Sequence, residues 1–142
     1  MRFRREYEFL SNFYPCRITM MMPDGKEHSF INAEAAFQAH KSSDTDVISQ
    51  FENIRGVTAK RLGKQIEITE GIENWNKEPV NVMRSVVSTK FKQNPELFSK
   101  LQSINERIVE ENSWHDTFWG VCDGVGENNL GKILEHIKSE VI

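Results

Sequence analysis

The stretch RITMMMPDGKEHSFINAEAAFQAHK, residues 17–41, decides the fold. Its first part holds two runs of strand-forming residues, Arg17–Met22 and Glu27–Ile31, and Pro followed by Asp-Gly between such runs is typical of a β-hairpin. Asn32 is then a natural N-cap for a helix over 33–41. The stretch therefore predicts an antiparallel hairpin followed at once by a short, alanine-rich helix.

Hydrophobic periodicity extends this pattern along the chain. The clearest further element is a helix over 78–93, where apolar residues recur at helical spacing. Shorter helices are predicted over 44–53, 57–65, 94–104 and 130–141, and strands over 2–9, 66–69 and 107–111. The expected class is α+β: a single compact, mostly helical domain with a small antiparallel sheet, spanning residues 1–142.

Composition and charge argue against several classes of protein. The 142 residues carry 18 basic and 21 acidic side chains, whereas a general DNA or RNA binder usually has a basic excess. No apolar stretch approaches the roughly 20 residues of a membrane helix, and the N-terminus does not look like a signal peptide. Cys16 and Cys122 lack CxxC spacing, which indicates two reduced thiols and a cytoplasmic location.

The helix over 33–41 is the first place where chemistry could lie. Glu34, Gln38 and Lys41 follow one another at i, i+4 and i+7, so they share one face of the helix. Three long polar side chains in a row fit the wall of a pocket, and they also fit a solvated helix face. The spacing leaves both interpretations open.

Two irregular segments are the other candidates. Over 9–14, aromatic residues stand beside Ser11 and Asn12, a combination that can stack on a flat base and bond to its edge, or form a hydrophobic plug. Over 116–131, glycines allow a ligand to approach the backbone, and the following helix offers N–H groups to a phosphate. A tight loop with a capped helix explains the same residues.

No motif points to a metal or to a catalytic triad. The four histidines have no ligand spacing, neither His-Glu-x-x-His nor a Walker loop is present, and no serine sits in a nucleophile elbow. We therefore expect neither a metal site nor a cofactor.

Six short motifs run in order along the chain: Phe9–Phe13, Glu34–Lys41, Ala59–Gly63, Trp75 ahead of Val82-Met83 and Lys90–Asn94, Asp116 with Trp119-Gly120, and Gly126–Gly131. Together they resemble the NADAR family, which includes the YbiA-like N-glycosidases. The likeness covers nearly the whole chain. Lys64 stands where the family usually has Arg, and Asn128 is an extra residue in the last motif.

The resemblance implies a hydrolase that acts on N-glycosyl bonds, without a cofactor. Its implied substrate joins a phosphoribose or ADP-ribose to a nucleobase-like group, as in the phosphoribosylamino-pyrimidine intermediates of riboflavin biosynthesis. Removal of ADP-ribose from guanine bases, including guanine in nucleic acid, is an alternative, and so is a non-catalytic module that binds NAD or ADP-ribose. The expected partner is thus a small molecule and not a membrane.

The resemblance also implies a site. Glu34 would protonate the leaving nitrogen and stabilise the cationic centre at C1′, Lys41 would form a Schiff base or bind phosphate, and Asp116 would orient water or hold the ribose hydroxyls. The implied substrate-binding residues are Ser11, Asn12, Phe13, Gln38, Trp75, Trp119, Gly120, Asp123 and Asn129. We predict that Glu34, Lys41, Trp75 and Asp116 converge on one pocket.

Overall fold

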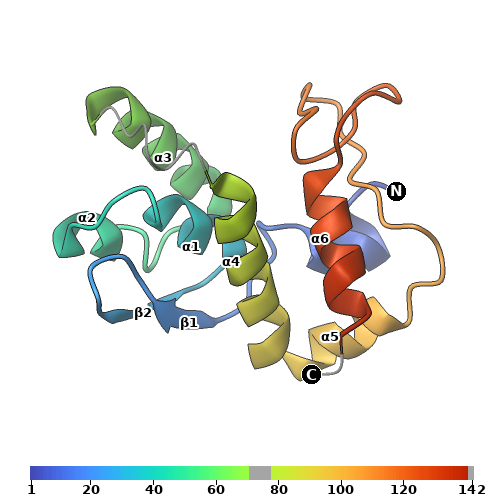
Figure 1. Cartoon of the computed structure of the whole chain (residues 1–142), viewed down its shortest axis with the longest axis horizontal. Helices are drawn as coiled ribbons and strands as arrows, with labels where there is room; N and C mark the ends of the chain where they lie inside the picture. Colours follow the sequence, from blue (N-terminus) through green and yellow to red (C-terminus); the bar gives the residue numbers. More distant parts are fainter. Residues whose placement is uncertain (71–77, 141–142) are drawn as a thin grey trace. The chain divides into compact units, whose positions relative to one another are not determined.

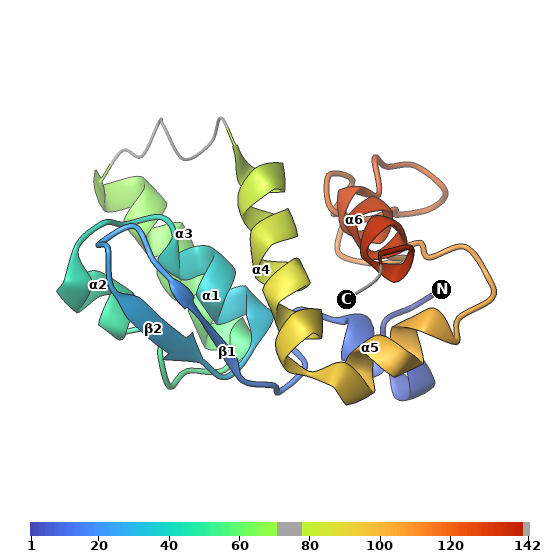
Figure 2. The ribbon, with the colours of Figure 1, turned by 60° about the horizontal axis from the view of Figure 1, so that its bottom comes forward.

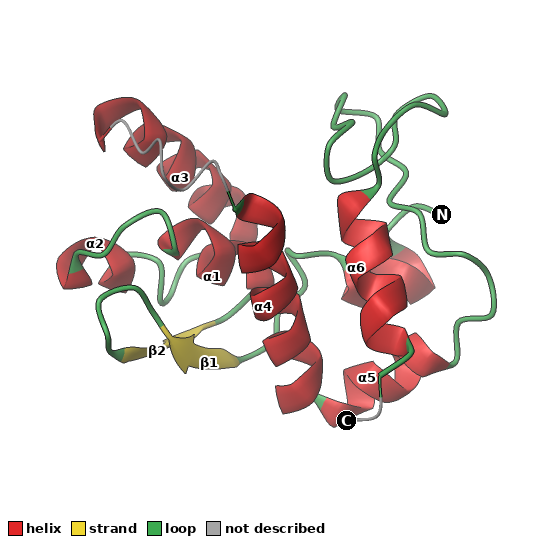
Figure 3. Ribbon diagram, viewed as in Figure 1, coloured by secondary structure: helices red, strands yellow, loops and turns green. Residues whose placement is uncertain are grey.

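The computed structural model describes residues 1–70 and 78–140 (Figure 1). Its elements, in chain order, are the 3-10 helix η1 (Arg5–Leu10), β1 (Ile18–Met21), β2 (Glu27–Phe30), α1 (Ala33–Ala39), α2 (Thr45–Ser49), α3 (Gly56–Glu70), α4 (Pro79–Gln93), α5 (Pro95–Gln102) and α6 (Asn129–Lys138). Figure 3 shows how far helix exceeds strand. The α+β class, mostly helical with a small antiparallel sheet, is confirmed.

The chain forms two compact units. Asn12–Gln93 makes up one, the inner unit, and Met1–Ser11 together with Asn94–Ile142 makes up the other, the terminal unit. The assignment of residues 1–142 to one domain stays a prediction. Within the described residues, no helix combines the length and the apolar character that crossing a membrane requires.

The predicted hairpin opens the inner unit. β1 and β2 pair antiparallel, with Ile18 opposite Phe30. Both of these side chains are fully buried, because β2 packs on α1 and β1 packs on α4. Gly25 has a φ of 79°, the left-handed conformation that the turn between the strands needs.

α1 lies at the centre of the inner unit, and all seven of its residues are buried. Its N-cap is the predicted one: Asn32 Oδ1 accepts a hydrogen bond from the Ala35 N–H (2.8 Å), and Asn32 Nδ2 donates to the Ile54 carbonyl (3.0 Å). α3 and α4 both pack against α1 (Figure 2). The small side chains that allow this are those of Ala33, Ala35, Ala36 and Ala39.

In the terminal unit, α5 packs on α6. The buried face of α6 is the apolar stripe predicted from helical spacing, formed by Leu130, Ile133, Leu134 and Ile137. Leu97 and Leu101 are the buried residues of α5.

The predicted strand over 2–9 is wrong. Arg5–Leu10 forms a 3-10 helix, in which the neighbours Phe9 and Leu10 are both buried. A strand would place these two side chains on opposite faces. Alternation over eight residues is a weak signal when no partner strand fixes it.

The strands predicted over 66–69 and 107–111 are wrong as well. β-branched residues favour a strand over 66–69, but α3 continues through them, since extending an existing helix adds one hydrogen bond per residue. Over 107–111 backbone pairing is limited to an isolated bridge between Glu111 and Val121. Two other backbone groups bond to a side chain: Asn128 Oδ1 accepts from the Glu110 N–H, and Asn128 Nδ2 donates to the Ile108 carbonyl.

Candidate functional site

The polar row of Glu34, Gln38 and Lys41 is buried, so it is not a solvated face. Glu34, Gln38 and Lys41 are 9%, 7% and 6% exposed. Gln38 Nε2 donates a hydrogen bond to Glu34 Oε2 at 2.7 Å, and Lys41 Nζ lies 3.5 Å from the Gly63 carbonyl oxygen. α1 ends at Ala39, short of the predicted residue 41. Glu34 and Gln38 therefore share one buried face of α1, whereas Lys41 lies in the turn after the helix and reaches Gly63 from there.

Gly63 of α3 allows α1 and α3 to approach this closely. A Cβ at position 63 would lie 1.9 Å from Gln38 Oε1 and 2.6 Å from Gln38 Cδ. Any side chain there would occupy the space of the Gln38 carboxamide. The glycine in the Ala59–Gly63 motif thus has a steric purpose within the site.

The loop before Cys16 lies at the N-terminal end of α1. The Glu34 N–H donates to the Asn12 carbonyl at 2.9 Å, and Asn12 Nδ2 donates to Met83 Sδ at 3.3 Å. The Phe13 ring packs over Gly56, where a Cβ would lie 2.5 Å from Phe13 Cδ1, yet the side chain remains 44% exposed. The structure thus brings the predicted residues Asn12 and Phe13 to the same unit as Glu34.

Lys90 of α4 is a buried cation whose importance we did not predict. It is 1% exposed, and its Nζ lies 5.9 Å from the Tyr14 ring centroid and 5.3 Å from that of Phe91. Burial lowers the pKa of Lys90 to about 8, although the charge of Cys16 acts in the opposite direction. A sequence signal existed: Lys90 follows Met83 at i+7, on the face whose other members are core residues.

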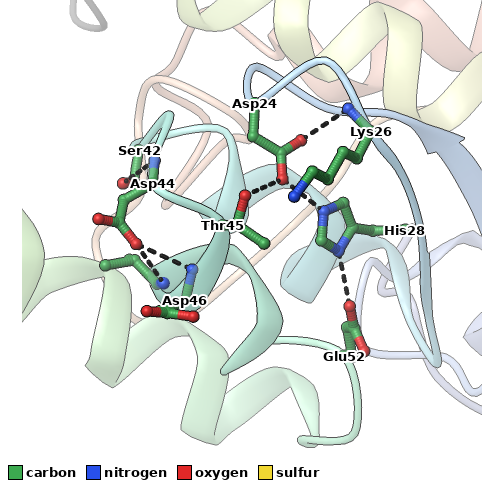
Figure 4. Close-up of polar contacts among 9 residues, drawn as sticks. Asp24, Lys26, His28, Ser42, Asp44, Thr45, Asp46 and Glu52 are labelled. Atoms are coloured by element: carbon green, nitrogen blue, oxygen red, sulfur yellow. Dashed lines mark hydrogen bonds and ion pairs between the residues drawn. The ribbon is translucent and has the colours of Figure 1, made fainter.

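Figure 4 shows a second polar cluster of the inner unit, around His28. His28 Nε2 lies 2.7 Å from Asp24 Oδ2 and Nδ1 lies 2.6 Å from Glu52 Oε1, while Thr45 Oγ1 donates to Asp24 Oδ2 at 2.9 Å. Burial lowers the pKa of His28, but the bonds to Glu52 and Asp24 outweigh it, and the pKa is raised. For Asp24 the two effects have the opposite signs: burial raises the pKa of its carboxyl group, but hydrogen bonds from His28, the Lys26 backbone and Thr45 outweigh burial and lower the pKa to about 2. The cluster fastens the hairpin turn to α2 and to Glu52.

The remaining predicted residues belong mainly to the terminal unit. Asp116 Oδ1 accepts from the backbone N–H groups of Phe118 (3.1 Å) and Trp119 (2.9 Å), so this carboxylate shapes its own loop. Asn129 Nδ2 donates to the Phe118 carbonyl at 3.0 Å, and the Phe118 and Trp119 rings meet edge to face, 4.8 Å apart. The convergence of Asp116 with Glu34 stays a prediction.

The glycines of this loop serve tight backbone contacts. A Cβ at Gly120 would lie 2.4 Å from the Glu110 carbonyl oxygen. Asp123 and Gly124 both have positive φ, 52° and 79°, between two residues that exchange backbone hydrogen bonds, Cys122 and Val125. This is the geometry of a two-residue hairpin turn, and it leaves Asp123 exposed at the tip.

Asn128, the extra residue of the last motif, is a structural link that we did not predict. It is 4% exposed and has a φ of 55°, and its side chain makes the two hydrogen bonds to the backbone over 108–110. Asn tolerates this left-handed conformation better than most residues. The combination of an Asn-Asn pair with a preceding glycine was the available signal.

Two predicted residues remain. Ser11 ends η1, where its N–H donates to the Glu8 carbonyl at 3.0 Å, and Trp75 lies outside the described residues. In the terminal unit an open cavity of about 600 Å³ contains none of the predicted site residues. Its lining is formed by Glu6, Tyr7, Phe9, Lys100, Ser103, Ile104, Asn105 and Glu106. In the part of the chain that the structure describes, no three His, Cys, Asp or Glu side chains form a group suited to a metal ion.

Comparison with known proteins assigns the chain to a family. The chain is 33% identical over 135 residues to the riboflavin biosynthesis protein VVA0006 of Vibrio vulnificus, an alignment that covers 94% of this chain and 35% of that protein. It is 29% identical over 143 residues to the chloroplastic riboflavin biosynthesis protein PYRR of Zea mays, covering 93% of this chain and 23% of that protein. The chain thus spans about a third or less of the length of these two relatives.

A shorter relative matches along most of its length. The N-glycosidase YbiA of Escherichia coli is 27% identical over 140 residues, which covers 96% of this chain and 82% of that protein. The NMR structure of E. coli YbiA superposes with a TM-score of 0.76 at 26% identity, covering 97% of this chain and 82% of that one. Residues 2–142 match the NADAR domain, and the chain belongs to the NADAR domain family.

Proposed function

We propose that the chain is an N-glycosidase that hydrolyses the bond between a phosphoribose or ADP-ribose and a nucleobase-like group. Family membership and the relatives named N-glycosidase and riboflavin biosynthesis protein support this proposal. The observation that carries it is the buried polar row formed by Glu34 and Gln38 on α1 and by Lys41 in the turn that follows α1.

The chemistry of the bond explains why these residue types are suitable. When the C1′–N bond breaks, positive charge develops at C1′ and the leaving nitrogen needs a proton. A buried carboxylate such as Glu34 stabilises that charge more strongly than a solvated one, because the surrounding dielectric is low. Lys41 either attacks C1′ as a nucleophile and forms a Schiff base, or holds the phosphate as a fixed cation.

For the substrate, we propose the phosphoribosylamino-pyrimidine intermediates of riboflavin biosynthesis. Two relatives are named for that pathway, and the exposed Phe13 ring beside α1 suits a flat heterocycle. We further propose that Asp116, Trp75 and Trp119 contact this substrate.

The test is release of free base. The purified chain is incubated separately with a phosphoribosylamino-pyrimidine, with NAD and with ADP-ribosylated guanosine, and the products are separated by chromatography. We expect base from the first substrate. If only ADP-ribosylated guanosine releases base, that compound replaces the pyrimidine as the proposed substrate. If none of the three releases base, the proposed N-glycosidase activity is refuted.

The matched variants are Glu34→Gln and Glu27→Gln. Glu34→Gln keeps the shape of the side chain but removes its charge and its ability to exchange a proton, so turnover should fall about 10²–10⁴-fold. Glu27 is an exposed acid on β2, and Glu27→Gln should leave turnover unchanged. Full turnover by Glu34→Gln would show that Glu34 has no role in the reaction.

A further inference from the structure

In the carboxamide of Gln38, the nitrogen has a hydrogen-bond partner and the oxygen has none. Its Nε2 donates to Glu34 Oε2 at 2.7 Å. Its Oε1 is one of two buried side-chain atoms in the described part of the chain that have no hydrogen-bond partner. A buried acceptor without a donor is unfavourable, so this orientation needs a physical cause.

The cause is the backbone of Gly63. Since a Cβ built on Gly63 would lie 1.9 Å from Gln38 Oε1, a Cα–H bond of Gly63 points at that oxygen. A Cα–H group is a weak donor, which suits a carbonyl oxygen and not an amide nitrogen. In the reversed orientation the NH₂ group would face the Cα–H bond, and the amide oxygen would face the Glu34 carboxylate.

We propose that Gln38, oriented by Gly63, is a positioning residue that keeps Glu34 ionised, so that Glu34 enters the reaction as a carboxylate and not as the proton donor. An N–H donor binds a charged oxygen more strongly than a neutral one, and Gln38 can present only N–H groups to Glu34. This inference rests on the proposed N-glycosidase function for its catalytic consequence, but the state of Glu34 is independent of that function.

The consequence is a different role for Glu34 from the one that the family resemblance implies. The C1′–N bond breaks with its electron pair leaving on nitrogen, and a water oxygen bonds to C1′ in its place. The water proton passes to the Glu34 carboxylate and from there to solvent, while the leaving nitrogen takes a proton from solvent. Glu34 thus stabilises the cationic centre and acts as a base.

The first experiment needs no substrate. At neutral pH, ¹³C NMR of the uniformly labelled chain gives the side-chain carboxyl signal of Glu34, assigned by its absence in Glu34→Gln. We expect it at the position of a carboxylate, and we expect one Gln38 side-chain N–H to be shifted downfield and protected from exchange in the wild type but not in Glu34→Gln. Glu27→Gln should leave the Gln38 signals unchanged. A Glu34 signal at the position of a neutral acid, or a Gln38 amide that ignores Glu34→Gln, would overturn the inference.

The second experiment separates positioning from substrate binding. Gln38→Met keeps the length of the side chain and removes the donor, so kcat should fall about ten- to a hundredfold, the usual scale for a residue that orients another, with KM nearly unchanged. Gln50→Met, at an exposed position after α2, is the control and should change neither constant. A raised KM with normal kcat would make Gln38 a substrate ligand and contradict the inference. If the wild type cleaves no substrate, the proposed function fails, and the NMR experiment still decides the role of Gln38.

Discussion

Gly63→Ala tests the packing on which the site depends. The added methyl group would lie 1.9 Å from Gln38 Oε1, so the carboxamide must move and give up its 2.7 Å bond to Glu34. A hydrogen bond to a charged group contributes about 1.5–3 kcal/mol, and overpacking an interior costs about 1–3 kcal/mol. Alanine is favoured over glycine inside a helix by about 1 kcal/mol, so the free energy of unfolding should fall by about 1.5–5 kcal/mol overall.

The assay is urea unfolding of four chains: wild type, Gly63→Ala, Gln38→Ala and the double variant. In the Gln38→Ala background the carboxamide is gone, and of the three atoms near position 63 only the Cβ of residue 38 remains, 3.1 Å away, so Gly63→Ala should cost much less than in the wild type. Thr58→Ala, at an exposed position of α3, controls for helix propensity and should have the same effect in both backgrounds. An equal loss for Gly63→Ala in both backgrounds, or no loss in the wild type, refutes the steric argument.

Three further predictions concern ionisable groups. Protonated His28, whose pKa is raised, stabilises the fold fully below about pH 6.5, and this stabilisation is lost as pH rises through the raised pKa. The Asp24 carboxylate, whose pKa is lowered, stabilises the fold above about pH 4, and this stabilisation is lost as pH falls through about 2. The His28→Gln variant should therefore lose the alkaline part of this dependence in chemical unfolding, and a curve parallel to the wild type would contradict the assignment. The pKa of Lys90 is about 8 instead of 10.5, so the free energy of unfolding of the wild type should rise by up to about 3 kcal/mol between these two pH values. Chemical unfolding at each pH measures this rise, which should be absent in Lys90→Met. For Lys41 we expect borohydride to trap a sugar adduct during turnover and Lys41→Arg to abolish turnover; retained turnover without an adduct would assign Lys41 to phosphate binding.

The sequence was informative where the signal was local. The Pro-Asp-Gly turn and the Asn32 cap each act within a few residues, and both the hairpin and α1 are where they were predicted. The spacing of Glu34 and Gln38 likewise placed them on one face correctly, whereas Lys41 lies beyond the end of α1, in the turn that follows. Whether that face is solvated or buried depends on Gly63, which comes from a different helix, and spacing within α1 holds no information about it.

Contacts between distant segments account for the features that could not be predicted. The strand predicted over 107–111 does not form: backbone pairing stops at an isolated Glu111–Val121 bridge, and the side chain of Asn128 binds the Glu110 N–H and the Ile108 carbonyl. Asp116 is different, because the backbone N–H groups that its Oδ1 binds lie two and three residues away in its own loop, a local contact that the motif does not reveal. Turn signals and periodicity supplied the fold class and the family resemblance supplied the candidate residues, whereas these bonding partners came only from the structure.

The shortness of α1 links catalysis to folding. Isolated helices below about 12 residues are marginal in water, and α1 has seven, all of them buried. α1 therefore owes its helicity to the helices and the hairpin around it. Its amide protons should exchange with deuterium only when the whole inner unit opens, so the proposed catalytic residue Glu34 is part of the slowest-exchanging region and not of a mobile lid. A peptide that carries the motif would be unstructured and inactive, and transplanting the site to another scaffold would require moving α1 together with its surroundings.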